Sequence, residues 1–241
     1  MFRNIMFYTG FILTIFPGYI GLVIPSGLLR LAGKKDAAES YLKKYSRFYF
    51  KLLIRMTGSR ITVTGSENFP GSSKGICVVA NHQSYTDILV IEAVVPFLVG
   101  FVAKKELSRV PVLRRWMKEL GCILIDRRSP KSAIEAISRG VDSIKKGKSL
   151  VIFPEGTRSR SQRMNGFKPG SLKLAIRARA VIVPITLNRT YRIYEEHSSV
   201  RSAEVSVVVH PPVDTSDPQN SDSKVLAEKL RKIIESGLEK E

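Results

Sequence analysis

The chain has 241 residues, 44% of them hydrophobic, and carries 39 Lys and Arg against 21 Asp and Glu, a net charge of +18. This length and apolar fraction allow a sizeable core, exclude a small disulfide-stapled domain, and favour one large domain with an appendage. The charge favours an anionic partner, which leaves nucleic acid, anionic lipid and a phosphorylated substrate open.

The first predicted element is an uncharged segment over residues 4–29, "NIMFYTGFILTIFPGYIGLVIPSGLL". It is longer than the roughly 20 residues that cross a bilayer core, so we predict membrane contact. Pro17 and Pro25 are expected to kink or break a helix, which leaves a straight span and a bent or re-entrant segment both open. A signal peptide is the alternative, but "GLLRLAGKK" matches a cleavage site poorly.

The next stretch, "YLKKYSRFYFKLLIRM" over residues 41–56, predicts a basic amphipathic helix. Aromatic and aliphatic residues recur at helical spacing, and cations recur every fourth residue. The apolar face could lie in a membrane interface or pack on the main domain, and we favour the interface. Four lysines predict that the rest of the protein is cytoplasmic: Lys34, Lys35, Lys43 and Lys44. Residues 1–58 are therefore predicted to be a membrane-associating two-helix region.

After Gly58, short apolar runs alternate with helix-like segments. Strands are predicted at residues 60–65, 75–80, 99–103, 121–126, 148–153, 180–187 and 203–210. Helices are predicted at residues 84–95, 111–119, 130–146, 170–179 and 222–237. This alternation predicts an α/β domain over residues 59–241, with a mixed, mostly parallel sheet flanked by helices.

The cysteines and histidines predict neither a disulfide framework nor a metal site. Cys77 and Cys122 lie in the apolar runs "GICVVA" and "GCILID", which is typical of core residues. His82, His197 and His210 are far apart in the sequence, and the chain has no paired metal-ligand motif.

The segment "NHQSYTD", residues 81–87, pairs a histidine with an aspartate at a strand-to-helix turn. On one continuous helix His82 and Asp87 would point about 140° apart, so a real pair requires His82 to lie in the turn. Ser84 is predicted as the N-cap, which makes Asp87 the third helical residue, at the positive end of the helix. Two interpretations stay open at this point: a helix cap, or a general base with its orienting carboxylate.

Cations follow several predicted strands. These cations are Lys104, Lys105, Arg127, Arg128, Arg158, Arg160, Arg163 and Lys168, and the carboxylate of Glu155 lies among them. Because ligands tend to bind at the carboxyl ends of strands in open α/β sheets, these loops could form an anion pocket beside His82. Arg127 and Arg158 follow closely on strands and are the better phosphate ligands, whereas Arg160 and Arg163 are interpreted as solvated.

Four blocks in order resemble the glycerolipid acyltransferases, most closely the bacterial 1-acyl-sn-glycerol-3-phosphate acyltransferases. "NHQSYTD" resembles the N-H-x4-D block of that family, "GCILIDR" its second block, "FPEGTRS" its third and "VIVPI" its fourth. "AKKEL" and "FKPG" also fit. The ordered set is specific although each block alone is weak, and it spans residues of about 75 to 190.

The resemblance implies that His82 is the general base and that Asp87 orients it. It implies further substrate-binding residues, several of them around the acceptor phosphate and glycerol: Lys104, Arg127, Glu155, Gly156, Thr157, Arg158, Lys168 and Pro184. The implied donor is an acyl thioester of coenzyme A or acyl carrier protein, without a further cofactor, and the implied acceptor is lysophosphatidate. The implied location is the cytoplasmic face of the inner membrane, in contact with its phospholipids and not with nucleic acid.

Two alternatives remain. A sister acyltransferase would use glycerol 3-phosphate or another lysolipid as acceptor. A non-enzymatic basic protein that binds membranes or nucleic acid would explain the charge, but not the ordered blocks.

Overall fold

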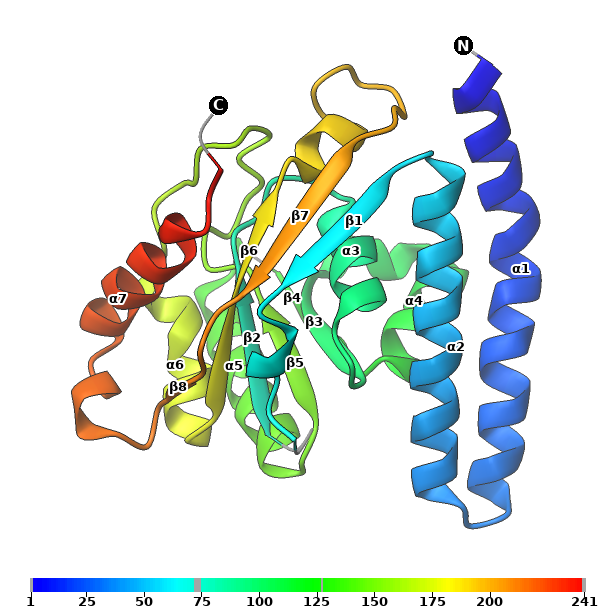
Figure 1. The fold of residues 1–241 in the computed structure, drawn as a ribbon. Coiled ribbons are helices and arrows are strands. Elements are labelled where there is room, and N and C mark those ends of the chain that lie inside the picture. The colour runs from blue at the N-terminus through cyan, green and yellow to red at the C-terminus, as the bar shows by residue number, and fades with distance from the viewer. Residues whose placement is uncertain (1, 72–74, 127, 240–241) are drawn as a thin grey trace.

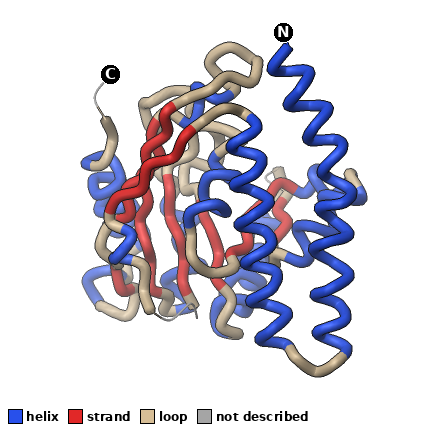
Figure 2. The backbone as a smooth tube through the Cα atoms, turned by 45° about the vertical axis from the view of Figure 1, so that its right-hand side comes forward, coloured by secondary structure: helices blue, strands red, loops and turns tan. Residues whose placement is uncertain are grey.

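One mixed sheet runs through the protein, with helices on both of its faces (Figures 1 and 2). The computed structural model describes residues 2–71, 75–126 and 128–239. The strands are β1 (Arg60–Thr64), β2 (Ile76–Ala80), β3 (Val99–Lys104), β4 (Ile123–Ile125), β5 (Ser149–Ile152), β6 (Val181–Asn188), β7 (Glu204–Val209) and β8 (Val213–Asp214). The helices are α1 (Phe2–Leu31), α2 (Lys35–Met56), α3 (Asp87–Val94), α4 (Pro111–Glu119), α5 (Pro130–Lys145), α6 (Pro169–Ala178) and α7 (Ser223–Ser236).

The strand order is β1-β7-β6-β2-β5-β3-β4, and β8 also pairs with β6. Every pair is parallel except those that β6 makes with β7 and β8. The predicted mixed, mostly parallel sheet is therefore confirmed, and the seven predicted strands and five predicted helices end within three residues of the observed bounds. Strand β8, which follows Pro211 and Pro212, was not predicted from the sequence. Prolines have no N–H for a ladder, so they separate β8 from β7.

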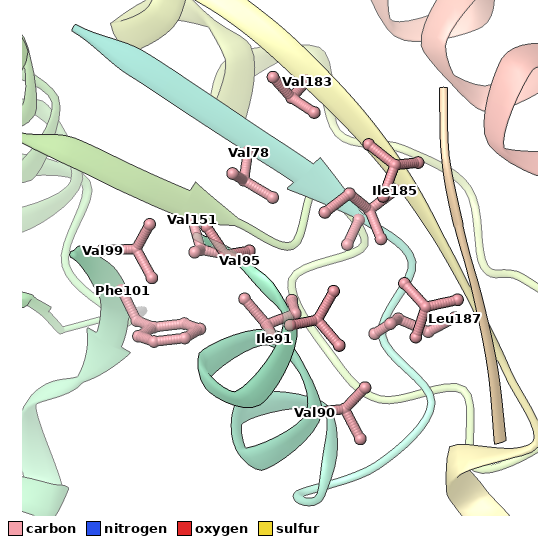
Figure 3. Close-up of a cluster of buried hydrophobic side chains, with 14 of the residues drawn as sticks. Val78, Val90, Ile91, Val95, Val99, Phe101, Val151, Val183, Ile185 and Leu187 are labelled. Atoms are coloured by element: carbon pink, nitrogen blue, oxygen red, sulfur yellow. The ribbon is translucent and has the colours of Figure 1, made fainter. Parts of the chain in front are cut away.

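The alternation of side chains along β2 builds both layers of the core. Val78 lies on the face that α3 covers (Figure 3), whereas Cys77 and Val79 lie on the face that α5, α6 and α7 cover. Both faces of this central strand are buried, as expected for a parallel strand between two helical layers. Cys77 and Cys122 are both free thiols, as predicted. Because β2 and β5 pair in parallel, their carboxyl ends lie side by side.

Helices α1 and α2 form an antiparallel hairpin beside the sheet (Figure 1). Pro17 and Pro25 lie inside α1, which continues past both, so neither proline breaks the helix. Pro25 has no N–H for the carbonyl oxygen of Gly21, and the hydroxyl of Tyr41 on α2 donates to that oxygen at 2.6 Å. Within the described residues, no helix combines the length and apolar character needed to cross a membrane.

The apolar face of α2 packs on the main domain, which is the alternative that the sequence analysis did not favour. Leu42, Tyr49 and Leu53 are buried in one cluster with Leu22 of α1 and Trp116 of α4. This face therefore stabilises the junction between the hairpin and the sheet. Membrane contact by other parts of the hairpin stays a prediction.

Candidate active site

His82 lies in the turn between β2 and α3, where its ring meets Asp87. Nδ1 of His82 is 2.7 Å from Oδ2 of Asp87. Helix α3 begins at Asp87 itself, after Thr86, so the predicted N-cap at Ser84 and the third helical position for Asp87 are wrong. The turn is two residues longer than predicted, and His82 lies within it, as the pair requires.

Asp87 accepts hydrogen bonds from four groups. Besides the ring of His82, Oδ2 accepts from the backbone N–H of Gln83 at 2.7 Å and of Ser84 at 2.9 Å, and Oδ1 accepts from the hydroxyl of Thr190 at 2.5 Å. The carboxyl is fully buried, and these four donors occupy both of its oxygens. Asp87 therefore serves both the turn and the histidine.

This arrangement sets the tautomer of His82. Because an ionised carboxylate only accepts hydrogen bonds, Nδ1 must carry the hydrogen. The lone pair of Nε2 then lies on the opposite side of a ring that is 12% exposed. The ring also stacks on Phe153, with centroids 4.1 Å apart and planes at 17°. A base with a fixed tautomer and orientation results.

Glu155, in the loop after β5, holds the backbone of the base. Its Oε1 accepts from the N–H of His82 at 2.7 Å, and its Oε2 accepts from the N–H of Asn165 at 2.8 Å. Burial raises the pKa of Glu155, while these two backbone donors work in the opposite direction. Both carboxylate oxygens are thus engaged with the chain. A carboxylate would also repel a phosphate, so the structure favours a positioning role for Glu155.

The same loop turns at Gly156, whose φ of +72° favours glycine. A β-carbon added there would lie 3.0 Å from Nζ of Lys168, so the ammonium group reaches directly over this backbone. Lys168 itself is anchored by its N–H, which donates to the carbonyl oxygen of Pro154 at 2.9 Å. Thr157 follows and is exposed. The third block, together with Lys168 of the "FKPG" segment, therefore presents backbone, a hydroxyl and an ammonium group.

Arg158 lies over Tyr85, a residue of the turn that carries His82. Its guanidinium carbon is 3.4 Å from the ring centroid of Tyr85, and Nη1 is 2.8 Å from Oε1 of Glu195. The side chain is 17% exposed. A backbone hydrogen bond also joins the loop of Arg158 to the turn that carries His82, since the N–H of Ser159 donates to the carbonyl oxygen of His82 at 2.8 Å. The structure thus brings Arg158 to the turn that carries His82, as predicted from the sequence.

Three other predicted residues remain, of which two make none of the contacts given above and one is not described. Lys104 ends β3, where its ammonium is 3.5 Å from Glu106 and its side chain is 52% exposed. Pro184 is buried in β6 opposite Val79 of β2, inside the sheet. Arg127 lies outside the described residues. The contacts above therefore include neither Lys104 nor Pro184.

Sequence reasoning missed four residues of the site: Gln83, Phe153, Thr190 and Glu195. Gln83 accepts at its side-chain oxygen from the N–H of Thr190 at 3.0 Å, which ties the base turn to the segment after β6. Gln83 and Phe153 lie inside the quoted blocks, so proximity could have suggested them. No local pattern indicated Thr190 or Glu195, which follow the last block.

Comparisons with known proteins identify a family for the chain. The model of a family described as "Acyltransferase" matches residues 60–188. The chain is 32% identical over 196 residues to the 1-acyl-sn-glycerol-3-phosphate acyltransferase of Borreliella burgdorferi, covering 80% of this chain and 77% of that protein. It is 31% identical to chloroplastic LPAT1 of Arabidopsis thaliana, named as the same enzyme, covering 82% of this chain.

The chain spans just over half, 56%, of the length of that plant relative. Among solved structures, it resembles the 1-acyl-sn-glycerophosphate (LPA) acyltransferase PlsC from Thermotoga maritima. The TM-score is 0.86 at 27% identity, over 98% of this chain and 93% of the other. The likeness therefore includes the N-terminal hairpin as well as the sheet.

Proposed function

Because the chain belongs to the acyltransferase family, we propose that it transfers an acyl chain from an acyl thioester to the sn-2 hydroxyl of 1-acylglycerol 3-phosphate, giving phosphatidate. One observation carries the chemistry: the contact between His82 and Asp87 at 2.7 Å leaves Nε2 as a base in a fixed orientation. The names of the relatives support the choice of acceptor.

The reaction begins with proton transfer. Nε2 of His82 takes the proton of the sn-2 hydroxyl while that oxygen attacks the carbonyl carbon of the thioester. The imidazolium that forms lies against the carboxylate of Asp87, which stabilises the new positive charge. A positioned general base typically contributes about 10²–10⁴-fold to the rate.

Collapse of the tetrahedral intermediate completes the transfer. The carbon–sulfur bond breaks, and the thiolate leaves as the new ester forms. Nε2 of His82 then returns its proton to the sulfur, so the free thiol is released and the base is neutral again. The acyl group passes directly from sulfur to oxygen, and no cofactor and no acyl-enzyme intermediate takes part.

Among the cations in the described residues, we assign Arg158 and Lys168 to the acceptor phosphate. The guanidinium of Arg158 offers paired donors on one edge. The ammonium of Lys168 lies over the backbone of Gly156, and Arg127 joins them by resemblance only. These contacts would hold the glycerol hydroxyl near Nε2 of His82, which lowers the entropic cost of bringing the reactants together.

The acyl donor is an acyl thioester of coenzyme A or acyl carrier protein, and the enzyme works at the cytoplasmic face of the inner membrane. The donor rests on the family resemblance, and the location rests on that resemblance and on the basic, apolar N-terminal region. A net charge of +18 would draw the protein to anionic phospholipids. The lipid acceptor and product would remain in the membrane throughout.

The test is acyl transfer to lysophosphatidate in phospholipid vesicles, followed by identification of the lipid product. We expect His82→Ala to lower kcat by about 10²–10⁴-fold because the general base is lost. His197→Ala is the matched control, because His197 is an exposed histidine that pairs with Glu196 at 3.4 Å. Wild-type turnover in a folded His82→Ala variant would contradict the mechanism.

Competition between acceptors tests the substrate. When all acceptors are present together, the acyl chain should be transferred to lysophosphatidate and not to glycerol 3-phosphate or to lysolipids with other headgroups. A preference for glycerol 3-phosphate would make the protein the sister enzyme. Duplex binding with a steep salt dependence, together with an absence of thioester cleavage, would instead indicate a nucleic-acid-binding protein.

A further inference from the structure

Glu195 is a buried carboxylate that bonds both to Arg158 and to the turn that carries His82. It lies two residues after the short helix Thr190–Ile193 that follows β6, and its side chain is 3% exposed. Oε1 accepts from Nη1 of Arg158 at 2.8 Å and from the N–H of Tyr85 at 3.0 Å, and Oε2 accepts from the hydroxyl of Ser84 at 2.5 Å. One side chain thus holds the arginine and the turn that carries the base.

These contacts fix the plane and one edge of the Arg158 guanidinium. Tyr85 covers one face, at 3.4 Å, and Glu195 occupies the Nη1 corner. An oxyanion that binds bidentately must approach in the guanidinium plane, along the edge that Glu195 does not occupy. The direction of approach is therefore set before any ligand arrives.

We infer that Glu195 is a positioning residue for the acceptor phosphate, acting through Arg158 and Tyr85. The inference rests on the proposed function, because it takes the phosphate of that acceptor as the ligand of Arg158. A long, flexible arginine loses rotational freedom when it binds, and prior fixation by Glu195 removes most of that loss.

Glu195 also has an opposing effect, since its negative charge repels a phosphate. The phosphate would lie on the far side of Arg158 and nearer to solvent, where water and salt screen the repulsion. The orienting contacts, in contrast, are direct and largely shielded from solvent. We therefore expect orientation to dominate, so that loss of Glu195 weakens phosphate binding.

The first experiment compares three variants by steady-state kinetics with lysophosphatidate. Glu195→Ala should raise the KM for lysophosphatidate about tenfold or more, as expected for loss of a charge-assisted contact. The KM for the acyl thioester should not change. Glu195→Gln keeps an oxygen that can accept from Arg158 and Tyr85, and should stay within about threefold of the wild type.

Glu196→Ala is the matched control, since it removes the same charge from the neighbouring, exposed carboxylate and should behave as the wild type. An equal rise of KM in Glu195→Ala and Glu196→Ala would overturn the inference, because the loss of one negative charge from this segment would then explain both. So would an unchanged KM in Glu195→Ala, or a tenfold rise in Glu195→Gln as well.

A double-mutant cycle tests whether Glu195 acts through Arg158. In an Arg158→Ala background, Glu195→Ala should add less than about twofold to KM, because coupled residues are not additive. Full additivity would show that the effect does not pass through the arginine. Thermal unfolding of each variant reports whether it is folded.

Direct binding separates this inference from the proposed function. Glycerol 3-phosphate should bind the wild type, measured by titration calorimetry, and bind Glu195→Ala about tenfold more weakly. If binding follows this pattern without transfer to lysophosphatidate, only the proposed acceptor is wrong. If the wild type does not bind this phosphate monoester, or Glu195→Ala binds it equally well, the inference is wrong.

Discussion

Asp87→Asn should separate the shape of the catalytic pair from its charge. In this variant the amide oxygen can take the place of Oδ2 and accept from His82, Gln83 and Ser84. The amide nitrogen then faces Thr190, whose hydroxyl can accept from it and can donate instead to the side-chain oxygen of Gln83, 3.1 Å away. The original donors all keep an acceptor, but the second N–H of the buried amide gains none, so the melting temperature should fall by several degrees while the variant stays folded.

The charge, however, is lost. Two unit charges about 4 Å apart interact by about 4 kcal/mol at an effective dielectric of about 20, a value suited to sites near a protein surface. The ring of His82 is 12% exposed, so water weakens this figure to an expected range of about 2–4 kcal/mol. Since about 1.4 kcal/mol is tenfold in rate, kcat should fall by about 30- to 1000-fold.

The assay is kcat for phosphatidate formation under saturating acceptor and thioester. The Asp87→Asn variant should retain most of the wild-type affinity for lysophosphatidate, since Arg158 does not contact Asp87. Its kcat should exceed that of His82→Ala, which lacks the base altogether. A folded Asp87→Asn variant with wild-type kcat would refute the assignment of Asp87 as the partner of the imidazolium.

Three further predictions concern the supporting residues. Thr190→Val removes the hydroxyl that donates to Asp87, and should lower kcat by about 3- to 10-fold in the same assay. Gly156→Ala forces alanine into a φ of +72°, and should lower the free energy of unfolding in urea by about 1–2 kcal/mol. Burial raises the pKa of Glu92 from 4.5 to about 7, against the attraction of Lys43. The native state thus holds this proton more tightly, so the contribution of Glu92 to stability is greatest below pH 4.5 and falls as the pH rises through 7. Glu92→Gln should remove about 3 kcal/mol of that loss, measured by denaturation across this pH range.

The order of helices and strands could be read from the sequence because its signals are local. Apolar runs flanked by turn residues predicted seven strands within three residues of their ends. The missed strand, β8, has only two residues, too few to show a pattern. The start of α3 was also misplaced: the hydroxyl of Ser84 donates to Glu195 and accepts from the N–H of Thr86, but the helical residues begin only at Asp87.

Long-range contacts decided the parts of the site that no pattern predicted. Thr190 reaches Asp87 across 103 residues of sequence, and Glu195 reaches Tyr85 across 110. Neither follows a spacing rule, because their positions depend on the pairing of β6 with β2. The same pairing brings the segment after β6 beside the base turn.

By itself, the sequence determined the alternation of the α/β domain, the two N-terminal helices and the identity of His82 and Asp87 as a candidate pair. These depend on hydrophobic periodicity, turn residues and residue chemistry, all of which act over a few neighbouring positions. Only the tertiary structure decided that the apolar face of α2 packs on the domain and that Glu155 holds the backbone of the base. It also decided that one buried carboxylate orients Arg158, because such contacts exist only once distant strands have paired.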